Sequence, residues 1–492
     1  MKHRLRMSAA VEQLLRSHHL AEGKHVEAIS LALGHAHTGP DGSVTVVLAD
    51  VDGVLRFADD CYESKGFAHA ALRKEVRAGV CWDAIRRGYS AIVDVHDHHF
   101  AAQAHFSSVD DADDQRTAVY FSRTLPAFLP PGGAMVAAAL LLSQGDWAAR
   151  LVHGGHAASP LATMRVDVLG LSDRQLSAGL PPATAAEFDR QQAVVPALVQ
   201  ERLRGLNAVI VGVGGTGSIM AESLSRLGFG HLSLIDADLL DTSNLNRFQG
   251  GRPADAGRPK VQCVAERLRD MCPQTAVAAI AAEVTASEAR EALEAADVLI
   301  GCVDNAETRW WLNRFAMQWL VPYFDCGVLI EAGADTAPLF HTRVHVVLPG
   351  VGPCGHCTPL DFFPRQKPIR FLDPTTLAEQ RAEGYLLHTD GTVADPSIYA
   401  LNQQAVSWLT QELVAWLTAG WPVAHTVHYR NDSSVIERLP LVSFGGAGAE
   451  DCPLCSHLVG RCNSISAPTE VNDRTSDFTL IPKGSHDGQI ST

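Results

Sequence analysis

The stretch Val209-Ile-Val-Gly-Val-Gly-Gly-Thr-Gly-Ser218 decides the fold of this chain. It is an apolar strand that runs into four glycines, Gly212, Gly214, Gly215 and Gly217. Such glycines allow a tight turn, let backbone N–H groups approach a phosphate, and open a helix whose positive end faces the anion. Asp236 ends a second apolar strand about 20 residues later, where a carboxylate reaches ribose hydroxyls. The stretch therefore predicts a nucleotide site on a βαβ unit.

Polar and basic side chains follow this unit. They are Asp238, Asn244, Asn246, Arg247, Gln249 and Lys260. A nicotinamide dehydrogenase does not require a cluster of amides and arginine followed by a lysine at this place. Cationic side chains at the phosphate end stabilise the charge that develops on a leaving phosphate group. The cluster therefore predicts a triphosphate that is handled for chemistry.

Continuous apolar runs predict a parallel sheet that is buried on both faces. They are Ala208–Gly212, Leu232–Ile235, Ala276–Ile280, Val298–Cys302 and Val321–Phe324. A helix over Ser218–Leu227 is expected to pack on this sheet. Asp304 and Cys326 would then lie at the carboxyl ends of strands, where open α/β sheets place their chemistry. Asp304 has a simpler alternative role, as the cap of a helix that begins near Ala306.

These motifs together resemble the ThiF/MoeB/HesA family, the bacterial relatives of ubiquitin-activating enzymes. The resemblance covers about residues 186–457. It is also carried by Phe188-Asp-Arg-Gln191, by Val303-Asp-Asn305 with Arg309 and Asn313, and by two CxxC pairs. It implies a Rossmann-like doubly wound α/β domain that uses ATP and Mg²⁺. Its implied reaction is adenylation of the C-terminal glycine of a small ubiquitin-like or sulfur-carrier protein, with release of pyrophosphate.

The resemblance also implies a role for each matching residue. Asp236 would hold the ribose, Arg247 and Lys260 the phosphates, and Asp304, followed by Asn305, the magnesium. Arg190 would reach the γ-phosphate from a second subunit, which implies a homodimer. The attacking carboxylate and the triphosphate are both anionic, so cationic side chains and Mg²⁺ must offset their repulsion.

The two CxxC pairs are the strongest metal signal in the chain. Cys354-Gly-His-Cys357 and Cys452-Pro-Leu-Cys455 each present two thiolates at knuckle spacing, and together they predict a closed, structural zinc site made of four cysteines. The family resemblance accounts for their long separation, because a helix over Ser397–Thr418 and a hairpin over His425–Leu441 fold back between them.

The loop between the first CxxC pair and that helix departs from many relatives, which carry a catalytic cysteine there. Thr358–Asp395 contains no cysteine. Either the reaction stops at the acyl-adenylate, or a cysteine elsewhere forms the thioester or persulfide. Cys302 and Cys326 follow buried strands and are expected to be packing residues. Cys462, near the C-terminal end, is expected to be freer.

The first 170 residues contain a second motif, Ile92-Val-Asp-Val-His-Asp-His-His-Phe100, followed by Phe106-Ser-Ser-Val-Asp110. Two histidines at i and i+2 and an aspartate, with one position left for water, form a catalytic zinc pattern. The motif resembles the JAB/MPN metalloproteases, which have an α+β fold. The resemblance implies that His96, His98 and Asp110 bind zinc, that Ser107 donates to the oxyanion, and that Glu27 is the general base.

Several alternatives remain open in this first domain. His99 replaces the family's usual proline, and eight residues rather than seven separate His98 from Ser107. A shifted register would use His99 as a ligand, with His105 as a spare. Glu27 could instead be an exposed helix residue, and the domain could be a decayed one that only binds. A hairpin is expected over Val136–Leu142 and Ala148–Val152.

Composition fits an intracellular enzyme of two domains. Of the 492 residues, 46% are apolar and 19% are charged, which suits buried cores. The net charge of −15 argues against nucleic acid as a partner. No run is long and apolar enough to span a membrane, and no signal peptide is apparent. Eleven cysteines suit metal binding in a reducing compartment, so the protein is expected to be cytoplasmic.

The chain is therefore expected to comprise a JAB/MPN-like metallopeptidase domain over 1–170, a linker over 171–185, a ThiF/MoeB-like adenylyltransferase domain over 186–460, and a flexible tail over 461–492. A rival interpretation is a nucleotide-binding regulatory or scaffold protein with one or both sites inactive. An NAD-dependent oxidoreductase is a weaker third. Arg190, Arg247 and Lys260 discriminate, since neither rival requires a triphosphate clamp. The sequence does not identify the partner or the pathway.

Overall fold

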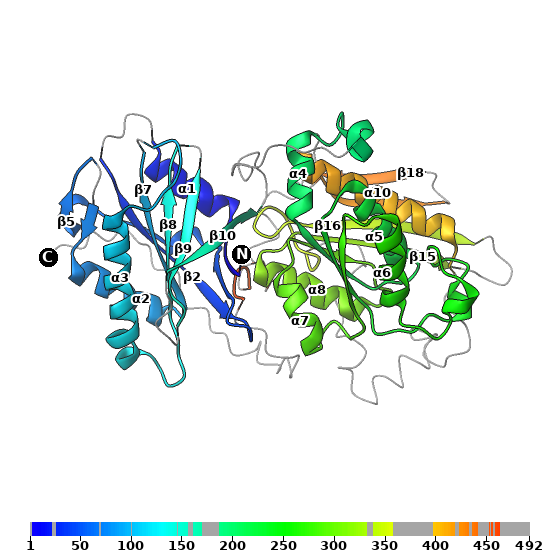
Figure 1. The fold of residues 1–492 in the computed structure, drawn as a ribbon, viewed down its shortest axis with the longest axis horizontal. Coiled ribbons are helices and arrows are strands. Elements are labelled where there is room, and N and C mark those ends of the chain that lie inside the picture. Colours follow the sequence, from blue (N-terminus) through cyan, green and yellow to red (C-terminus); the bar gives the residue numbers. More distant parts are fainter. Residues whose placement is uncertain are drawn as a thin grey trace.

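The computed structural model contains two eight-stranded sheets, one in each of two lobes that lie side by side (Figure 1). The structure describes residues 2–21, 26–67, 70–99, 101–144, 146–155, 161–169, 186–331, 338–357, 397–418, 423–431, 435–440, 452, 454–455 and 458–462. The predicted linker 171–185, the cysteine-free loop and most of the predicted tail lie outside these residues.

The sheet of the second lobe has the strand order β13-β12-β11-β14-β15-β16-β17-β18. Its first five strands are parallel, as predicted: β11 (Asn207–Val211), β12 (His231–Ile235), β13 (Ala276–Ile280), β14 (Val298–Gly301) and β15 (Tyr323–Glu331). Three antiparallel strands extend it: β16 (Leu339–Val347), β17 (Ala424–Arg430) and β18 (Val435–Pro440). The predicted hairpin is therefore confirmed as β17 and β18, but its place at the edge of the same sheet was not predicted.

Helices cover both faces of the parallel strands, which explains why these strands are mainly apolar. Ile210 of β11 packs on one side in a core shared with α5 (Gly215–Leu227), α6 (Lys260–Met271) and α10 (Tyr399–Thr418). Its neighbours Val209 and Val211 point to the other side, toward α7 (Ser287–Glu294) and α8 (Ala306–Trp319). Two shorter elements, η4 (Ala186–Gln191) and α4 (Ala197–Gly205), precede β11, and η5 (Thr242–Asn244) and η6 (Pro253–Asp255) follow β12. Among the described residues, none of the helices is both long and apolar enough to cross a membrane.

The first lobe combines strands and helices, which agrees with the α+β class. Its sheet has the order β3-β1-β10-β9-β8-β7-β2-β4, and β2 also pairs with β3, so the sheet curls and closes on itself. The strands are β1 (His3–Ser8), β2 (Ile29–Thr38), β3 (Val44–Leu48), β4 (Val54–Arg56), β7 (Ala91–Asp97), β8 (Val136–Leu142), β9 (Trp147–His153) and β10 (Ala162–Leu169). β8 and β9 are the predicted hairpin.

Helices pack against both faces of this curled sheet. α1 (Ala9–His19) buries Val11 and Leu15 in one core. α2 (Lys74–Arg86) and α3 (Ser108–Arg123) bury Ala84 and Phe121 in the other. The remaining elements are short: β5 (Tyr62–Lys65), β6 (Ala70–Leu72), η1 (Val51–Gly53), η2 (Asp59–Cys61) and η3 (Leu125–Phe128).

The two lobes meet at Asp297, which immediately precedes β14. Its Oδ1 accepts a hydrogen bond from Arg4 Nη1 of β1 at 2.7 Å and forms an ion pair with Arg165 Nη2 of β10 at 2.9 Å. Its Oδ2 accepts from the backbone N–H of Asn207, the first residue of β11, at 2.8 Å. One buried carboxylate thus joins two strands of the first lobe to two of the second.

Arg6 makes a second connection between the lobes. This buried side chain donates to the carbonyl oxygens of Glu294 at 3.1 Å, Ala296 at 2.7 Å and Trp319 at 3.1 Å. Those carbonyls lie at the ends of α7 and α8, where a helix leaves its last carbonyls without partners. Burial lowers the pKa of Arg6 to about 10, so the side chain remains charged at neutral pH.

The segment 458–462 lies between the lobes. The backbone N–H of Gly460 donates to Met317 O of α8 at 3.0 Å, and a Cβ on Gly460 would lie only 2.4 Å from Cβ of Ala49 in the first lobe. Cys462 is fully buried, and burial raises its pKa to about 12. The expectation that Cys462 is freer is therefore wrong, because this part of the chain packs between the lobes.

Arg6→Ala should lower the free energy of unfolding by about 3 kcal/mol or more, because it leaves buried carbonyls without donors. Chemical denaturation measures the change. Arg86→Ala is the control, since 76% of the Arg86 side chain is exposed and its loss should change stability by less than about 0.5 kcal/mol. Equal effects of the two substitutions would contradict the role assigned to Arg6.

Candidate active sites and metal centre

The turn between β11 and α5 needs its glycines for geometric reasons. Gly212 has φ of +83°, a conformation that side chains disfavour. A Cβ on Gly217 would lie 1.9 Å from the carbonyl oxygen of Gly212. At Gly214, by contrast, no atom of the described part of the chain lies within 4 Å of an ideal Cβ. The packing of the chain therefore explains glycine at 212 and 217, but not at 214.

Asp236 lies at the end of β12, next to this turn. Its carboxylate accepts from the backbone N–H of Val213 at 2.6 Å and of Asp238 at 2.8 Å. Burial raises the pKa of Asp236, and those two hydrogen bonds offset part of the rise. The carboxylate is thus fixed against the glycine turn.

Arg247 and Lys260 lie near the same turn, as the sequence predicts. A Cβ on Gly215 would lie 3.3 Å from Cγ of Arg247, so this arginine packs on the first turn of α5. Its guanidinium donates to Ser243 O at 2.9 Å and to Asn246 Oδ1 at 3.1 Å. Lys260 begins α6 and contacts Asp238 Oδ2 at 2.7 Å.

The polar neighbours of Arg247 shape the loop that carries it. Asn244 Oδ1 accepts from the backbone N–H of Asp241 at 3.2 Å, which caps η5. Gln249 Nε2 donates to Glu222 Oε2 of α5 at 2.9 Å. These side chains hold the loop against α5.

Asn402 of α10 also lies at this turn, although the sequence did not predict it. A Cβ on Gly215 would lie 2.3 Å from Asn402 Nδ2. The start of α10 is further joined to the loop by a bond from Asn246 Nδ2 to Ser397 O at 3.3 Å and by a bond from the hydroxyl of Tyr399 to Gln249 Oε1. No local pattern marks Asn402, because only the tertiary fold brings α10 to the glycine turn.

The start of α8 shows whether Asp304 caps this helix or is available to bind magnesium. Asn305 is the N-cap of this helix, and its side chain accepts from the backbone N–H of Thr308 at 2.8 Å. Asp304 is exposed at the carboxyl end of β14. The capping role therefore belongs to Asn305 rather than to Asp304.

Other residues of the family motifs hold the fold in place. Arg309 is buried and pairs with Asp325 Oδ1 at 3.1 Å. Phe188 is buried, and Gln191 donates to Leu227 O at 3.0 Å. Arg190 is exposed on η4, and its role across a dimer stays a prediction.

Cys302 and Cys326 lie in the core of the second lobe, as expected of packing residues. Their Sγ atoms are 3.8 Å apart. The hydrogen bond between the two thiols and their burial raise the pKa of Cys326 well above its ordinary value. This environment disfavours the thiolate that a catalytic nucleophile requires.

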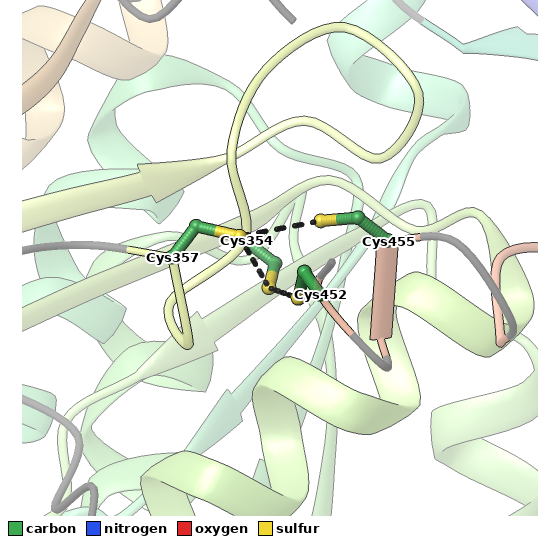
Figure 2. A group of neighbouring side chains, drawn as sticks. All are labelled: Cys354, Cys357, Cys452 and Cys455. Carbon is green, nitrogen blue, oxygen red and sulfur yellow. Dashed lines mark hydrogen bonds between the residues drawn. The ribbon is translucent and has the colours of Figure 1, made fainter. Parts of the chain in front are cut away.

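The four cysteines of the CxxC pairs converge on one point (Figure 2). Sulfur–sulfur distances are 3.9 Å for Cys354–Cys357, 3.6 Å for Cys354–Cys452 and 3.7 Å for Cys357–Cys455. Four sulfur atoms bound tetrahedrally to Zn²⁺ at about 2.3 Å lie about 3.8 Å apart. The hydrogen bond between Cys354 and Cys452 lowers the pKa of Cys452 to about 4 and raises the pKa of Cys354, so these two sulfur atoms are close enough to share a proton. The donor set and its spacing fit a structural zinc ion.

A second group of possible metal ligands converges in the first lobe. The ligand atoms of Glu27, His96 and His98 all lie within 4.8 Å of one another. Asp110 joins them: its Oδ1 is 3.3 Å from His96 Nε2, and its Oδ2 is 3.7 Å from His98 Nε2. Tetrahedral ligands at about 2.0 Å from one zinc ion would be about 3.3 Å apart. Two imidazoles and nearby carboxylates at this spacing fit a zinc ion.

Segments far apart in the sequence build this group. His96 lies on β7 and His98 directly after it, while Glu27 comes just before β2, whose Ile29 pairs with His96. Glu27 is buried and lies outside any helix, so the alternative of an exposed helix residue is wrong. Asp110 is in the first turn of α3.

Ser107 forms the N-cap of α3 and is bound to Asp110 in both directions. The Ser107 hydroxyl accepts from the backbone N–H of Asp110 at 3.3 Å, and Asp110 Oδ2 accepts from the backbone N–H of Ser107 at 2.6 Å. This capping box orients the Asp110 carboxylate. It also gives Ser107 a structural role that is compatible with the predicted catalytic one.

The structure distinguishes between the two registers considered for the ligands. His99 Nδ1 bonds to Asp97 Oδ1 at 2.9 Å, and His105 Nε2 lies 3.3 Å from Gln103 Oε1. Within the described residues, His98 and not His99 belongs to the group with Glu27 and His96.

The histidines and carboxylates of this group shift one another's pKa values. Burial would lower the pKa of His96, but its hydrogen bond to Asp110 and the nearby carboxylates outweigh burial and the pKa is raised. Burial and the neighbouring His96 lower the pKa of His98.

A parallel sheet with a glycine turn at the carboxyl end of β11, a fixed carboxylate at the end of β12 and an arginine on the first turn of α5 defines a nucleotide-binding α/β protein. Comparison with known proteins identifies the group within this class. Residues 188–435 match the model of the ThiF family, which is half of the chain. The chain belongs to the ThiF family.

Curated relatives match about a third of the chain. The sulfur carrier protein adenylyltransferase of Thermus thermophilus is 30% identical over 190 residues, which are 38% of this chain and 67% of the relative. The sulfur carrier protein ThiS adenylyltransferase of Bacillus subtilis is 32% identical over 181 residues, 36% of this chain and 51% of the relative. The ubiquitin-like modifier-activating enzyme 5 of Dictyostelium discoideum is 30% identical over 171 residues, 32% of this chain and 43% of the relative. The chain thus spans less than half the length of the Dictyostelium protein.

Among solved structures, Escherichia coli MccB with MccA-N7isoASN is similar to this chain with a TM-score of 0.45 and 16% identity. The similarity covers 55% of this chain and 75% of that one.

Cys452→Ser should release the zinc of the cysteine site and destabilise the second lobe, because a structural zinc contributes folding free energy directly. Metal analysis of the purified chain, together with its melting temperature, measures both effects. Cys263→Ser is the matched control, because Cys263 is a buried cysteine of α6 outside the cluster. A Cys452→Ser protein with unchanged zinc content would exclude this site.

Proposed function

We propose that the second lobe adenylates the C-terminal carboxylate of a small ubiquitin-like or sulfur-carrier protein, with ATP and Mg²⁺ as co-reactants. The observation that carries the proposal is that the side chains of Arg247 and Asn402 pack against Gly215 in the first turn of α5, next to the glycine turn. Membership of the ThiF family supports it, as do the printed names of the Thermus and Bacillus relatives, which are sulfur-carrier adenylyltransferases.

In this reaction a carboxylate oxygen of the partner attacks the α-phosphorus of ATP, and the bond from that phosphorus to the pyrophosphate oxygen breaks. Asp236 would accept hydrogen bonds from the ribose hydroxyls. The backbone N–H groups at the start of α5, together with the helix dipole, would bind phosphate oxygens. Arg247 and Lys260 would offset the charge on the leaving pyrophosphate. Asp304 would hold Mg²⁺, which supplies further positive charge at the phosphates when bound.

Gly214 supports the same assignment. Among the residues that the structure describes, no atom lies within 4 Å of a Cβ at this position, so their packing does not require glycine there. Close approach of a phosphate to the backbone would require it. Lys260 would exchange its contact with Asp238 for a phosphate oxygen when ATP binds.

Arg247→Ala and Asp304→Ala should each reduce ATP–pyrophosphate exchange, measured in the presence of the partner, by about 10²-fold or more, because each removes charge stabilisation in the transition state. Arg226→Ala, an exposed α5 arginine paired with Glu222, is the matched control and should leave exchange unchanged. Exchange that persists in both Arg247→Ala and Asp304→Ala would contradict the proposal. Tight binding of NAD in place of ATP would favour the oxidoreductase instead.

For the first lobe we propose a zinc-dependent isopeptidase that cleaves after the terminal glycine of a ubiquitin-like protein. The convergence of Glu27, His96, His98 and Asp110 supports this second function. His96, His98 and Asp110 would hold a zinc ion, which lowers the pKa of a bound water when present. Glu27, buried beside them, would accept the proton of that water and pass it to the leaving amine. The Ser107 hydroxyl would donate to the developing oxyanion.

Glu27→Gln should retain the metal and lose cleavage, because it removes the base and leaves the ligands in place. His98→Ala should lose both. Metal content of the full chain and cleavage of a ubiquitin-like protein extended beyond its terminal glycine measure the two effects. His105→Ala, which changes a histidine outside the group, is the control and should change neither. A chain that holds only the cysteine-bound zinc would indicate a first lobe that binds without cleaving.

A further inference from the structure

We propose that Asp97 is a positioning residue that sets the distance between Glu27 and the histidine ligands; this inference rests on the proposed peptidase function of the first lobe. Asp97 is the last residue of β7 and lies between His96 and His98 in the sequence. Its side chain is fully buried. Because successive side chains of a strand point to opposite faces, Asp97 lies on the other face of β7 from His96, yet it connects the segments that build the metal group.

Hydrogen bonds from Ala28, His19 and His99 converge on the Asp97 carboxylate. Oδ2 accepts from the backbone N–H of Ala28 at 3.1 Å and from His19 Nδ1 at 2.8 Å. Oδ1 accepts from His99 Nδ1 at 2.9 Å. A buried carboxylate is tolerated only where such donors replace water, so these bonds determine its position.

The bond from Ala28 links the general base to the ligands. Ala28 directly follows Glu27, whose own backbone N–H donates to Gly66 O at 2.9 Å. The hydrogen bond from Ala28 to Asp97 holds the residue after Glu27 against the end of β7, at the position between His96 and His98. The carboxylate of Glu27 is therefore held within 4.8 Å of the ligand nitrogens by a contact outside the metal group.

The bond from His19 extends the connection to α1. His19 Nε2 lies 3.0 Å from Ser30 Oγ, and His18 Nδ1 lies 2.8 Å from the same hydroxyl. Ser30 is on β2, where it pairs with Val95 of β7. The last turn of α1, β2 and β7 thus share one buried polar network with Asp97 at its centre.

The bond from His99 fixes the chain on the other side of the ligands. His98 is followed at once by a residue whose ring is bound to Asp97 and packs edge-on against Phe67 with ring centroids 5.4 Å apart. The Asp97 carboxylate therefore bonds to His99, on one side of His98, and to Ala28 of the segment that carries Glu27. Partners of this kind, beyond the ligands themselves, commonly change metal affinity or activity by about 10- to 100-fold when removed.

The test uses the full chain with its cysteine-bound zinc retained and zinc alone as the probe for the second site. Asp97→Ala should weaken binding of this second zinc by about 10- to 100-fold. It should lower kcat for cleavage while KM changes by less than about threefold, because the surface that binds the partner is unchanged. Cobalt placed in the second site should show shifted visible absorption bands, because its ligands are held less firmly.

Two further variants keep the test informative if Asp97→Ala does not fold. Asp97→Asn retains an acceptor for Ala28 and should recover part of the zinc affinity and kcat. His19→Leu removes the donor to Asp97 Oδ2 and should shift both in the same direction as Asp97→Ala. His153→Leu is the matched control: this buried β9 histidine packs near Phe121 and should leave zinc affinity and the cobalt spectrum unchanged.

Normal zinc affinity, cobalt spectrum and kcat in a folded Asp97→Ala protein, or in His19→Leu if Asp97→Ala does not fold, would overturn the positioning role while leaving the peptidase proposal intact. A wild-type chain that binds no second zinc and cleaves nothing would instead overturn the peptidase proposal, and the positioning role with it.

Discussion

The carboxylate of Asp297 is the contact on which the arrangement of the two lobes depends. It accepts from Arg4 and Arg165 of the first lobe and from the backbone of Asn207 in the second. Because Asp297 precedes β14 and Asn207 begins β11, the same carboxylate also fixes two neighbouring strands of the parallel sheet. A buried charge that satisfies donors from several strands is costly to leave unpaired, so the lobes are held in one relative position.

This connection places both candidate sites on one framework. The glycine turn and Asp304 extend from the carboxyl ends of β11 and β14, the two strands that Asp297 joins at their other ends. In the first lobe, the two arginines come from β1 and β10, which pair with each other in the closed sheet that also carries β7 and its histidines. The segment 458–462, which follows the cysteine site, packs between the lobes. The elements that carry the two sites therefore share one interface.

Much of this could be predicted from the sequence where a signal is local. Apolar runs predicted the five parallel strands, and glycine spacing predicted the turn before α5. The CxxC pairs and the His96/His98 pair predicted two groups that do converge. The sequence did not reveal features that depend on distant pairing. β16 joins β17 across a separation of nearly 90 residues in the register His341–Arg430. Asn402 reaches the glycine turn, and Asp97 reaches His19, only through the tertiary fold. The burial of Cys462 arises from the contact between the lobes, which no pattern near Cys462 indicates.

The central claim is that the second lobe transfers AMP to a protein carboxylate. Intact-mass spectrometry tests it most directly, with a small ubiquitin-like protein ending in Gly-Gly incubated with the full chain, ATP and Mg²⁺. The account predicts that this protein gains the mass of one AMP group at its C-terminus, and that removal of the last glycine abolishes the gain. Consumption of ATP without any adenylate on the partner, or a gain of AMP at another residue, would contradict the account.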